Sequence, residues 1–303
     1  MSTTRFSVVH RTDYRYGSPM ADGYSVAHLL PRPTTRQRVV SASIDVDPAP
    51  DEFEELADLF GNRVVRIGVH RRHEHLCVVG RCVVEVDDET PAHGLDLATA
   101  RADPSWDDVA ALLGAARGDL AVEVAPFVAA TRATPEVAML DELVGDLFVP
   151  GRSLSGLVRA VGRRIHQSFV FDPGFSDVAT PVAEVVAARR GVCQDFAHVM
   201  LACLRSKGLA ARYVSGYVET LPPPGAAKLV GVDASHAWCS VWSPVGGWLD
   251  IDPTNDQMPP SRHVTVAWGR DYTDVAPVRG VVIGPSATQH LSVAVDVGSS
   301  SVG

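Results

Sequence analysis

Residues 191–198 read Gly-Val-Cys-Gln-Asp-Phe-Ala-His, and this stretch decides the fold that we expect. From 196 to 204, apolar residues recur at three- and four-residue spacing, which predicts one buried face of a helix that ends before Gly208. Cys193 therefore lies at the predicted start of this helix. Free backbone N–H groups and the helix dipole favour an anion at that position, so a thiolate would be stabilised there.

A histidine that could act as the base for this thiol is found in Asp-Ala-Ser-His-Ala-Trp (233–238), where His236 begins a predicted strand. His198 is the local competitor. It lies five residues after Cys193 on the same helix, which turns it about 140° away, and it is better placed to pair with Asp195 at i, i+3. We therefore expect His236 to be the base and His198 to support the structure.

A carboxylate that could orient the histidine follows from the register of a predicted hairpin. If the loop Ser-Pro-Val-Gly-Gly joins two strands, Trp242 faces Trp248. The same register makes Asp252 the diagonal neighbour of His236 on one face of the sheet, while Asp250 lies too far along the strand. Asp252 could then accept the imidazole N–H and stabilise the protonated ring.

The remaining patterns predict an α+β protein with an N-terminal antiparallel β region. Strands are expected at 6–10, 39–46, 63–67, 76–86, 211–218, 236–242, 248–252 and 291–297, and helices at 105–117, 135–147, 153–167 and 181–190. The expected units are a β-sandwich-like region (1–90), a helical connecting region (91–150), a catalytic core (151–260) and C-terminal strands packing on the core or the N-terminal region (261–303).

Composition and charge exclude several functional classes. Of the 303 residues, 46% are hydrophobic and 21% charged, which is typical of a globular protein, and the formal net charge of -9 argues against binding to nucleic acid or an anionic membrane. Charged residues interrupt the apolar residues of segment 1–17, which argues against a secretory signal there. No stretch approaches the roughly 20 apolar residues that a membrane span needs. We expect a cytoplasmic protein.

The five cysteines are odd in number and widely scattered, without a Cys-x-x-Cys pair. This spacing predicts neither a disulfide scaffold nor a structural zinc site.

Four motifs together resemble the bacterial transglutaminase-like proteins. They are Gly-Val-Cys-Gln-Asp-Phe-Ala-His (191–198), Ala-Arg-Tyr-Val-Ser-Gly-Tyr (211–217), Asp-Ala-Ser-His-Ala-Trp (233–238) and Asp-Pro-Thr-Asn (252–255). The segments 30–32, 58–62 and 268–272 also resemble parts of that family, so the likeness extends over nearly the whole chain.

The resemblance implies a papain-like transglutaminase core in which a cysteine, a histidine and an aspartate act in that chain order. These roles carry over to Cys193, His236 and Asp252, and the side chains expected to support them are Gln194, Asp195, His198 and Trp238. It implies no cofactor and no metal. The wider superfamily contains protein crosslinkers, peptidases, deamidases and peptide N-glycanases, so a peptide or protein substrate is expected while the acceptor stays open. The motifs do not identify the second donor to the oxyanion or the oligomeric state.

We favour a cysteine hydrolase, a protease or deamidase, because nothing in the sequence identifies a site for a second protein chain. Three alternatives stay open. The first is a crosslinking transglutaminase, and the second is a catalytically silent binding module on the same fold. The third is a metal hydrolase with Cys193, His198 and His236 as ligands.

Overall fold

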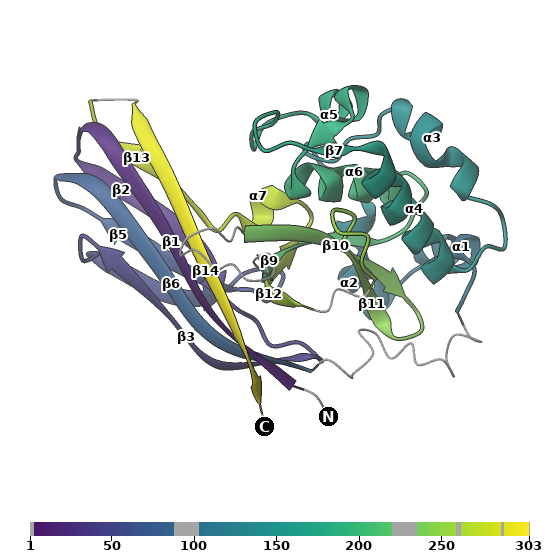
Figure 1. Cartoon of the computed structure of the whole chain (residues 1–303), viewed down its shortest axis with the longest axis horizontal. Coiled ribbons are helices and arrows are strands. Elements are labelled where there is room, and N and C mark those ends of the chain that lie inside the picture. Colours follow the sequence, from purple (N-terminus) through teal and green to yellow (C-terminus); the bar gives the residue numbers. More distant parts are fainter. Residues whose placement is uncertain (1–2, 88–102, 220–234, 259–261, 286–287, 303) are drawn as a thin grey trace, which may run out of the picture.

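The computed structural model describes residues 3–87, 103–219, 235–258, 262–285 and 288–302. Two β-sheets at one side of the molecule stand against a core of helices and a third sheet (Figure 1). The helix that carries Cys193 packs on this third, antiparallel sheet, so the predicted α+β class and core arrangement are confirmed.

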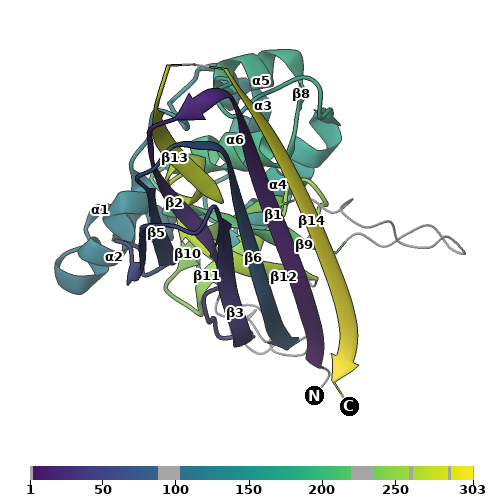
Figure 2. The ribbon, with the colours of Figure 1, turned by 90° about the vertical axis from the view of Figure 1, so that its left-hand side faces the viewer.

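The N-terminal β region consists of two four-stranded antiparallel sheets. Their strand orders are β14-β1-β6-β3 and β13-β2-β5-β4. The strands are β1 (Thr3–Met20), β2 (Asp22–Leu30), β3 (Gln37–Asp47), β4 (Glu52–Ala57), β5 (Arg63–Val69), β6 (His73–Asp87), β13 (Val278–Ile283) and β14 (Gln289–Val302). Apolar side chains of β2, β5 and β6 form the cluster between the sheets. The C-terminal strands thus return to the start of the chain, with β14 along the edge beside β1 (Figure 2).

The core has a four-stranded sheet in the order β11-β10-β9-β12. Its strands are β9 (Ala211–Val218), β10 (Ser235–Ser243), β11 (Gly247–Ile251) and β12 (His263–Gly269). The helices are α1 (Trp106–Gly114), α2 (Gly118–Val128), α3 (Met139–Val144), the 3₁₀ turn η2 (Gly145–Leu147), α4 (Leu154–Ser168), α5 (Val182–Ala188), α6 (Cys193–Arg205) and α7 (Tyr272–Val275). A two-stranded parallel pair, β7 (Val170–Phe171) and β8 (Arg190–Gly191), precedes α6.

Helix α6 is the most deeply buried helix element of the core. From Asp195 to Arg205 every side chain is buried, and the helix contacts β9, β10, α4 and α5. The same hydrophobic cluster also includes Phe6 and Val8 of β1. The core sheet is therefore covered by α6 on one face and faces the N-terminal β region with the other, so its functional side chains have rigid support.

Several elements differ from those expected, for identifiable reasons. Helix α2 was missed because its valine-rich sequence contains Pro126, a residue that disfavours a helix interior. The edge strand β4 was missed because its acidic sequence lacks apolar alternation. The predicted helix 135–147 begins only at Met139. Strands β2, β12 and β13 were also not predicted, and part of the expected connecting region (91–150) lies outside the described residues.

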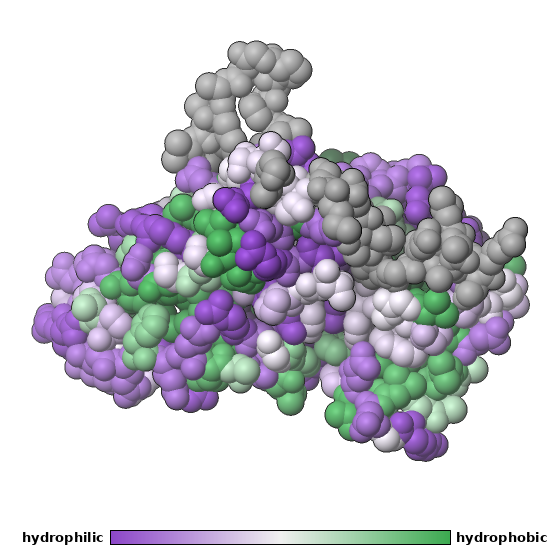
Figure 3. Space-filling view, turned by 90° about the horizontal axis from the view of Figure 1, so that it is seen from below, coloured by the Kyte–Doolittle hydropathy of each residue, from purple (hydrophilic) through white to green (hydrophobic). Residues whose placement is uncertain are grey.

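None of the described helices is long and apolar enough to cross a membrane. On the face seen from below, hydrophobic surface is divided into patches by hydrophilic side chains (Figure 3).

Candidate active site

The start of α6 is fixed by a short set of local hydrogen bonds. The carboxylate oxygen Oδ2 of Asp195 accepts the backbone N–H of Val192 at 2.8 Å and the hydroxyl of Ser176 at 2.5 Å. Gly191 is needed beside it, because a Cβ there would lie 2.6 Å from the same oxygen. Burial raises the pKa of Asp195. These contacts hold Cys193 at the first position of the helix, where its side chain is half-buried.

His236 occupies the face of β10 that also carries Trp238. It pairs with Gly216 of β9, and a Cβ on this glycine would lie 2.6 Å from the Trp238 ring and 2.0 Å from the carbonyl oxygen of Val264. The rings of His236 and Trp238 stack with centroids 6.2 Å apart. The glycine therefore makes room for the indole, and the indole supports the imidazole.

Asp252 lies at the end of the predicted hairpin, in the predicted register. Trp242 pairs with Trp248, and the ladder continues to the pair Cys239–Ile251. The next residue brings Asp252 Oδ2 to 2.7 Å from Nε2 of His236. The diagonal contact expected from the hairpin is therefore present in the structure.

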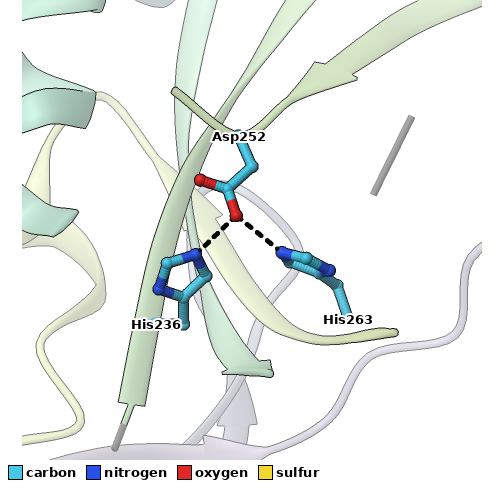
Figure 4. Close-up of side chains that lie close together, drawn as sticks. All are labelled: His236, Asp252 and His263. Carbon is cyan, nitrogen blue, oxygen red and sulfur yellow. Dashed lines mark hydrogen bonds and ion pairs between the residues drawn. The ribbon is translucent and has the colours of Figure 1, made fainter. Parts of the chain in front are cut away.

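Five hydrogen bonds converge on the fully buried carboxylate of Asp252. Oδ2 accepts Nε2 of His236, Nε2 of His263 at 2.9 Å and Nδ2 of Asn255 at 2.7 Å. Oδ1 accepts the backbone N–H groups of Thr254 at 2.9 Å and Asn255 at 3.2 Å. The carboxylate lies between the two imidazoles, and Nδ1 of His236 points away from it (Figure 4). A buried carboxylate with this many donors is held in one orientation.

The electrostatics of the site favour a protonated His236. Burial opposes this charge, but hydrogen bonds to Asp252 and to Cys193, and the charges of both partners, raise the pKa of His236 to about 10. Burial also opposes ionisation of Asp252, yet the hydrogen bonds from His236 and His263 lower the pKa of this carboxyl well below its usual range. The pKa of His263 is lowered by burial, so this ring is the neutral donor of the pair.

Cys193 differs from the other cysteines of the core. Cys203 and Cys239 are buried, and burial raises the pKa of the Cys203 thiol to about 12 and that of Cys239 well above its usual value. Cys239 donates its S–H to the carbonyl oxygen of Ala197. Cys193, by contrast, is only half-buried, and it is one of the two residues that raise the pKa of His236.

The supporting residues occupy different places. Trp238 contacts both imidazoles, since its ring lies 5.0 Å from that of His263 as well as against His236. Gln194, beside Cys193, approaches the carbonyl oxygen of Val178 at 3.4 Å. Asp233 and Ala234, which complete the histidine motif, lie outside the described residues.

The expected pairing of His198 with Asp195 is wrong. Nε2 of His198 accepts the backbone N–H of Tyr272 at 3.2 Å, its ring packs on Tyr213, and burial lowers its pKa to about 4. Asp195 instead bonds the start of its own helix. The helical spacing was correct, but Asp195 accepts the backbone N–H of Val192, just before the start of α6, in place of a bond from His198.

Sequence reasoning missed His263 and gave no role to Asn255. Asn255 was visible in the motif Asp-Pro-Thr-Asn, where an amide three residues after Asp252 can turn back onto it. His263 begins the alternating run His-Val-Thr-Val-Ala-Trp, which is a strand signal. Its proximity to Asp252 comes from the pairing of β12 with β9, which no local pattern predicts.

One group of described side chains could hold a metal ion by proximity, namely His236, Asp252 and His263, whose ligand atoms lie within 4.8 Å of one another. Both Nε2 atoms face the same oxygen at hydrogen-bond distance, so the arrangement is that of two N–H donors sharing one acceptor. Cys193, His198 and His236 do not form such a group within the part of the chain that the structure describes. The alternative metal hydrolase is therefore not supported by the geometry.

Comparison with known proteins identifies the family of the chain. The family model described as the bacterial transglutaminase-like N-terminal region matches residues 6–85, and that of the transglutaminase-like superfamily matches residues 148–253. An uncharacterized protein of Mycobacterium tuberculosis is 39% identical over 302 residues, which cover 97% of this chain and 93% of that protein. The chain belongs to the transglutaminase-like superfamily. An uncharacterized protein of Mycobacterium leprae is 33% identical over 293 residues, which cover 97% of this transglutaminase-like chain and 98% of that protein.

Two further comparisons are with a protein that matches a short stretch of this chain and with a solved structure that matches all of it. A Pseudomonas aeruginosa protein named protein-glutamine gamma-glutamyltransferase is 43% identical over 72 residues, which are 23% of this chain and 11% of that protein. The crystal structure of a candidate cysteine protease from Cytophaga hutchinsonii superposes with a TM-score of 0.72 at 20% identity, covering 100% of this chain and 92% of the other. The second comparison shows a shared fold for both regions of the transglutaminase-like chain.

Proposed function

We propose that this protein is a cysteine-dependent acyl-transfer enzyme that hydrolyses peptide or carboxamide bonds through Cys193, His236 and Asp252. The observation that carries the proposal is the hydrogen bond from His236 to the buried Asp252, in a site where Asp252 and Cys193 at the start of α6 raise the pKa of His236 to about 10. A thiolate and an imidazolium are the reactive form of such a pair. The family match supports an enzyme of this superfamily.

The thiolate of Cys193 attacks the carbonyl carbon of the substrate, and the electron pair of the C=O bond moves to oxygen. The backbone N–H of Cys193, at the start of α6, is placed to donate to this oxyanion. His236 then gives its proton to the leaving amine as the C–N bond breaks, which leaves a thioester. A water molecule, deprotonated by His236, attacks the thioester and releases the acid and the thiolate.

Asp252 keeps His236 in one tautomer with Nε2–H toward the carboxylate, so that Nδ1 is the nitrogen that exchanges the proton with sulfur. His263 and Asn255 hold Asp252 in turn. These three are positioning residues, because they act on the substrate only through His236.

A crosslinking transglutaminase is the second candidate. It is favoured by the stretch of 72 residues that is 43% identical to the protein-glutamine gamma-glutamyltransferase. In that reaction a lysine amine, rather than water, resolves the thioester. The substrate of either reaction is a peptide or protein, and a cytoplasmic location remains part of the proposal.

A peptide library incubated with the protein and read by mass spectrometry tests the proposal. Cleaved peptides would identify a peptidase, and a gain of about one mass unit a deamidase, whereas joined peptides with loss of ammonia would identify a crosslinker. Cys193→Ala should abolish the products, and Cys203→Ala, which removes a buried thiol of the same helix, should retain them. Identical product lists from wild type and Cys193→Ala would contradict an enzymatic role and favour the silent binding module.

A further inference from the structure

A cavity lies on the face of the core sheet that is turned away from α6. Its volume is about 1110 Å³, and its walls come from the core sheet, from α2 and from the N-terminal β region. Cys193, His236 and Asp252 are not among the residues that line it, although His263 is. The cavity is therefore separate from the thiol, and it is large enough for a small organic molecule.

Five phenylalanine and tryptophan side chains contribute to the walls of the cavity. Phe60 contacts Phe127 of α2 with ring centroids 5.6 Å apart, and Phe127 contacts Trp248 of β11 at 5.1 Å. Trp238 of β10 and Trp268 of β12, the strands on either side of β9, also line the cavity. Such walls suit an apolar or aromatic body.

The wall from the N-terminal region is fixed to the core by hydrogen bonds. Nε2 of Gln37 donates to the carbonyl oxygens of Arg32 at 2.8 Å and Thr265 at 2.7 Å, and its Oε1 accepts the backbone N–H of Thr265 at 2.9 Å. The cavity is thus a formed feature of the fold and not a seam between independent parts.

The lining of this cavity includes a buried arginine, Arg212, whose Nε has no partner among the described residues. Its side chain is only 8% exposed, and its guanidinium lies 3.6 Å from the ring centroid of Trp268 and 4.3 Å from that of Trp248. Within the described ranges, its buried Nε has no hydrogen-bond acceptor and no carboxylate lies within ion-pair distance of it. Burial lowers the pKa of Arg212 to about 9. The residue thus holds a charge that the aromatic rings stabilise only in part.

A second buried arginine shows what a structural role looks like in this protein. Arg205 at the end of α6 is 5% exposed, yet it donates to the carbonyl oxygens of Phe127 and Ala211 and to the hydroxyl of Thr134. Arg205 therefore joins several chain segments by hydrogen bonds to their buried acceptors. The side chain of Arg212 makes no such hydrogen bond to the described residues, which indicates a different role.

The charges around Arg212 limit the ligand. Asp250 and Glu123 also line the cavity and act on Arg212 from beyond ion-pair distance, and Glu123 accepts Nε1–H of Trp248 at 3.2 Å. Arg36 also lines the cavity, so the cavity's two guanidinium groups and two carboxylates carry no net charge together. A ligand with two negative charges, such as phosphate, would leave a larger uncompensated charge there than a ligand with one. A single carboxylate matches the planar fork of the guanidinium.

We propose that this cavity binds a small apolar monocarboxylate, with the carboxylate on Arg212 and the apolar body among Phe127, Trp238 and Trp248. The site is independent of Cys193, and its occupant contacts a wall that includes His263, the partner of Asp252.

Isothermal titration calorimetry with 3-phenylpropionate tests the proposal, on wild type and on Cys193→Ala so that turnover cannot mimic binding. Saturable one-to-one binding is expected in both proteins. The neutral 3-phenylpropan-1-ol and inorganic phosphate should bind at least about tenfold more weakly, because each lacks one element of the match. Arg212→Gln should weaken binding of 3-phenylpropionate by at least about tenfold, while the control Arg66→Gln, which removes an exposed charge of β5, should leave it unchanged.

Arg212→Lys covers the case in which Arg212→Gln does not fold, since it keeps the charge and loses the fork, and it should also bind more weakly. Equal affinity for the carboxylate and the alcohol would overturn the proposal. Equal affinity of the Arg212 variants and wild type, or no saturable binding of 3-phenylpropionate to the folded wild type, would do the same.

Discussion

Two regions of the core bury an ionised side chain, and they treat it in opposite ways. Around Asp252, five donors surround a carboxylate with no exposed surface, and every one of its hydrogen bonds lies between 2.7 and 3.2 Å. Around Arg212, two indole rings cover a guanidinium whose Nε lacks an acceptor among the described residues. The first charge is fully compensated within the protein, and the second is not.

The difference separates a site that is prepared for chemistry from one that is prepared for a ligand. A saturated network fixes geometry and tunes the neighbouring pKa, as it does for His236, and each missing member should reduce activity. A buried charge without a partner costs stability until something pairs with it. Changes around Asp252 should therefore reduce catalysis, and changes at Arg212 should leave catalysis intact.

Asp252→Asn is expected to have the largest effect. An amide cannot accept two imidazole N–H groups on a charged oxygen, so kcat should fall by about 10³–10⁴-fold. Loss of the negative charge also removes the main interaction that raises the pKa of His236, so the alkaline fall of kcat/KM should move from near pH 10 to lower pH. A pH–rate profile on a peptide substrate measures both effects.

Asp250→Asn is the matched control, because Asp250 lies two residues earlier on β11 and faces Ser240 in the ladder. Its profile should stay close to that of wild type. An equal loss of activity in the two variants would refute a specific role for Asp252.

His263→Ala should have a smaller effect. A hydrogen bond to a charged group contributes about 1.5–3 kcal/mol, so activity should fall by roughly 10–100-fold. Because Asp252 keeps its charge, the alkaline limb should move less than in Asp252→Asn. His263→Gln, whose amide can still donate, should recover part of the activity; wild-type activity in His263→Ala would show that the contact is dispensable.

Arg212→Met is expected to have the smallest effect. The variant loses contacts with two indoles, about 0.5–2 kcal/mol each, but it also removes a poorly compensated buried charge, so the free energy of unfolding should fall by no more than about 1 kcal/mol. Arg205→Met, which leaves several buried carbonyls unpaired, should lose about 3–5 kcal/mol. Urea unfolding measures both. A large loss in Arg212→Met would mean that this charge is compensated within the fold.

The sequence was sufficient for the parts of the site that depend on local geometry. A helix stripe placed Cys193 at the start of α6, and the pairing of Trp242 with Trp248 placed Asp252 beside His236. Both follow from regular periodicities of helices and hairpins, which a single chain segment encodes. The α+β class followed for the same reason.

The features that could not be predicted depend on contacts between distant segments. His263 reaches Asp252 because β12 pairs with β9. The cavity at Arg212 depends on the contact of the N-terminal region with β12, which Gln37 and Asn62 make by hydrogen bonds. Helix α2 was hidden by Pro126, whose propensity the surrounding packing overrides. The strand register and the burial that result from contacts between segments far apart in the sequence cannot be predicted from the local pattern of either segment.

The most direct test of the central claim is the rate at which iodoacetamide alkylates Cys193 between pH 5 and 9, measured by peptide mass spectrometry. If His236 and Cys193 form an imidazolium–thiolate pair, the wild-type rate should change little from pH 6 to 8 and exceed the rates of Cys203 and Cys239 by more than about tenfold. In His236→Ala the rate should instead rise about tenfold per pH unit, as for an ordinary thiol. Identical pH dependence of Cys193 alkylation in the two proteins would contradict the account.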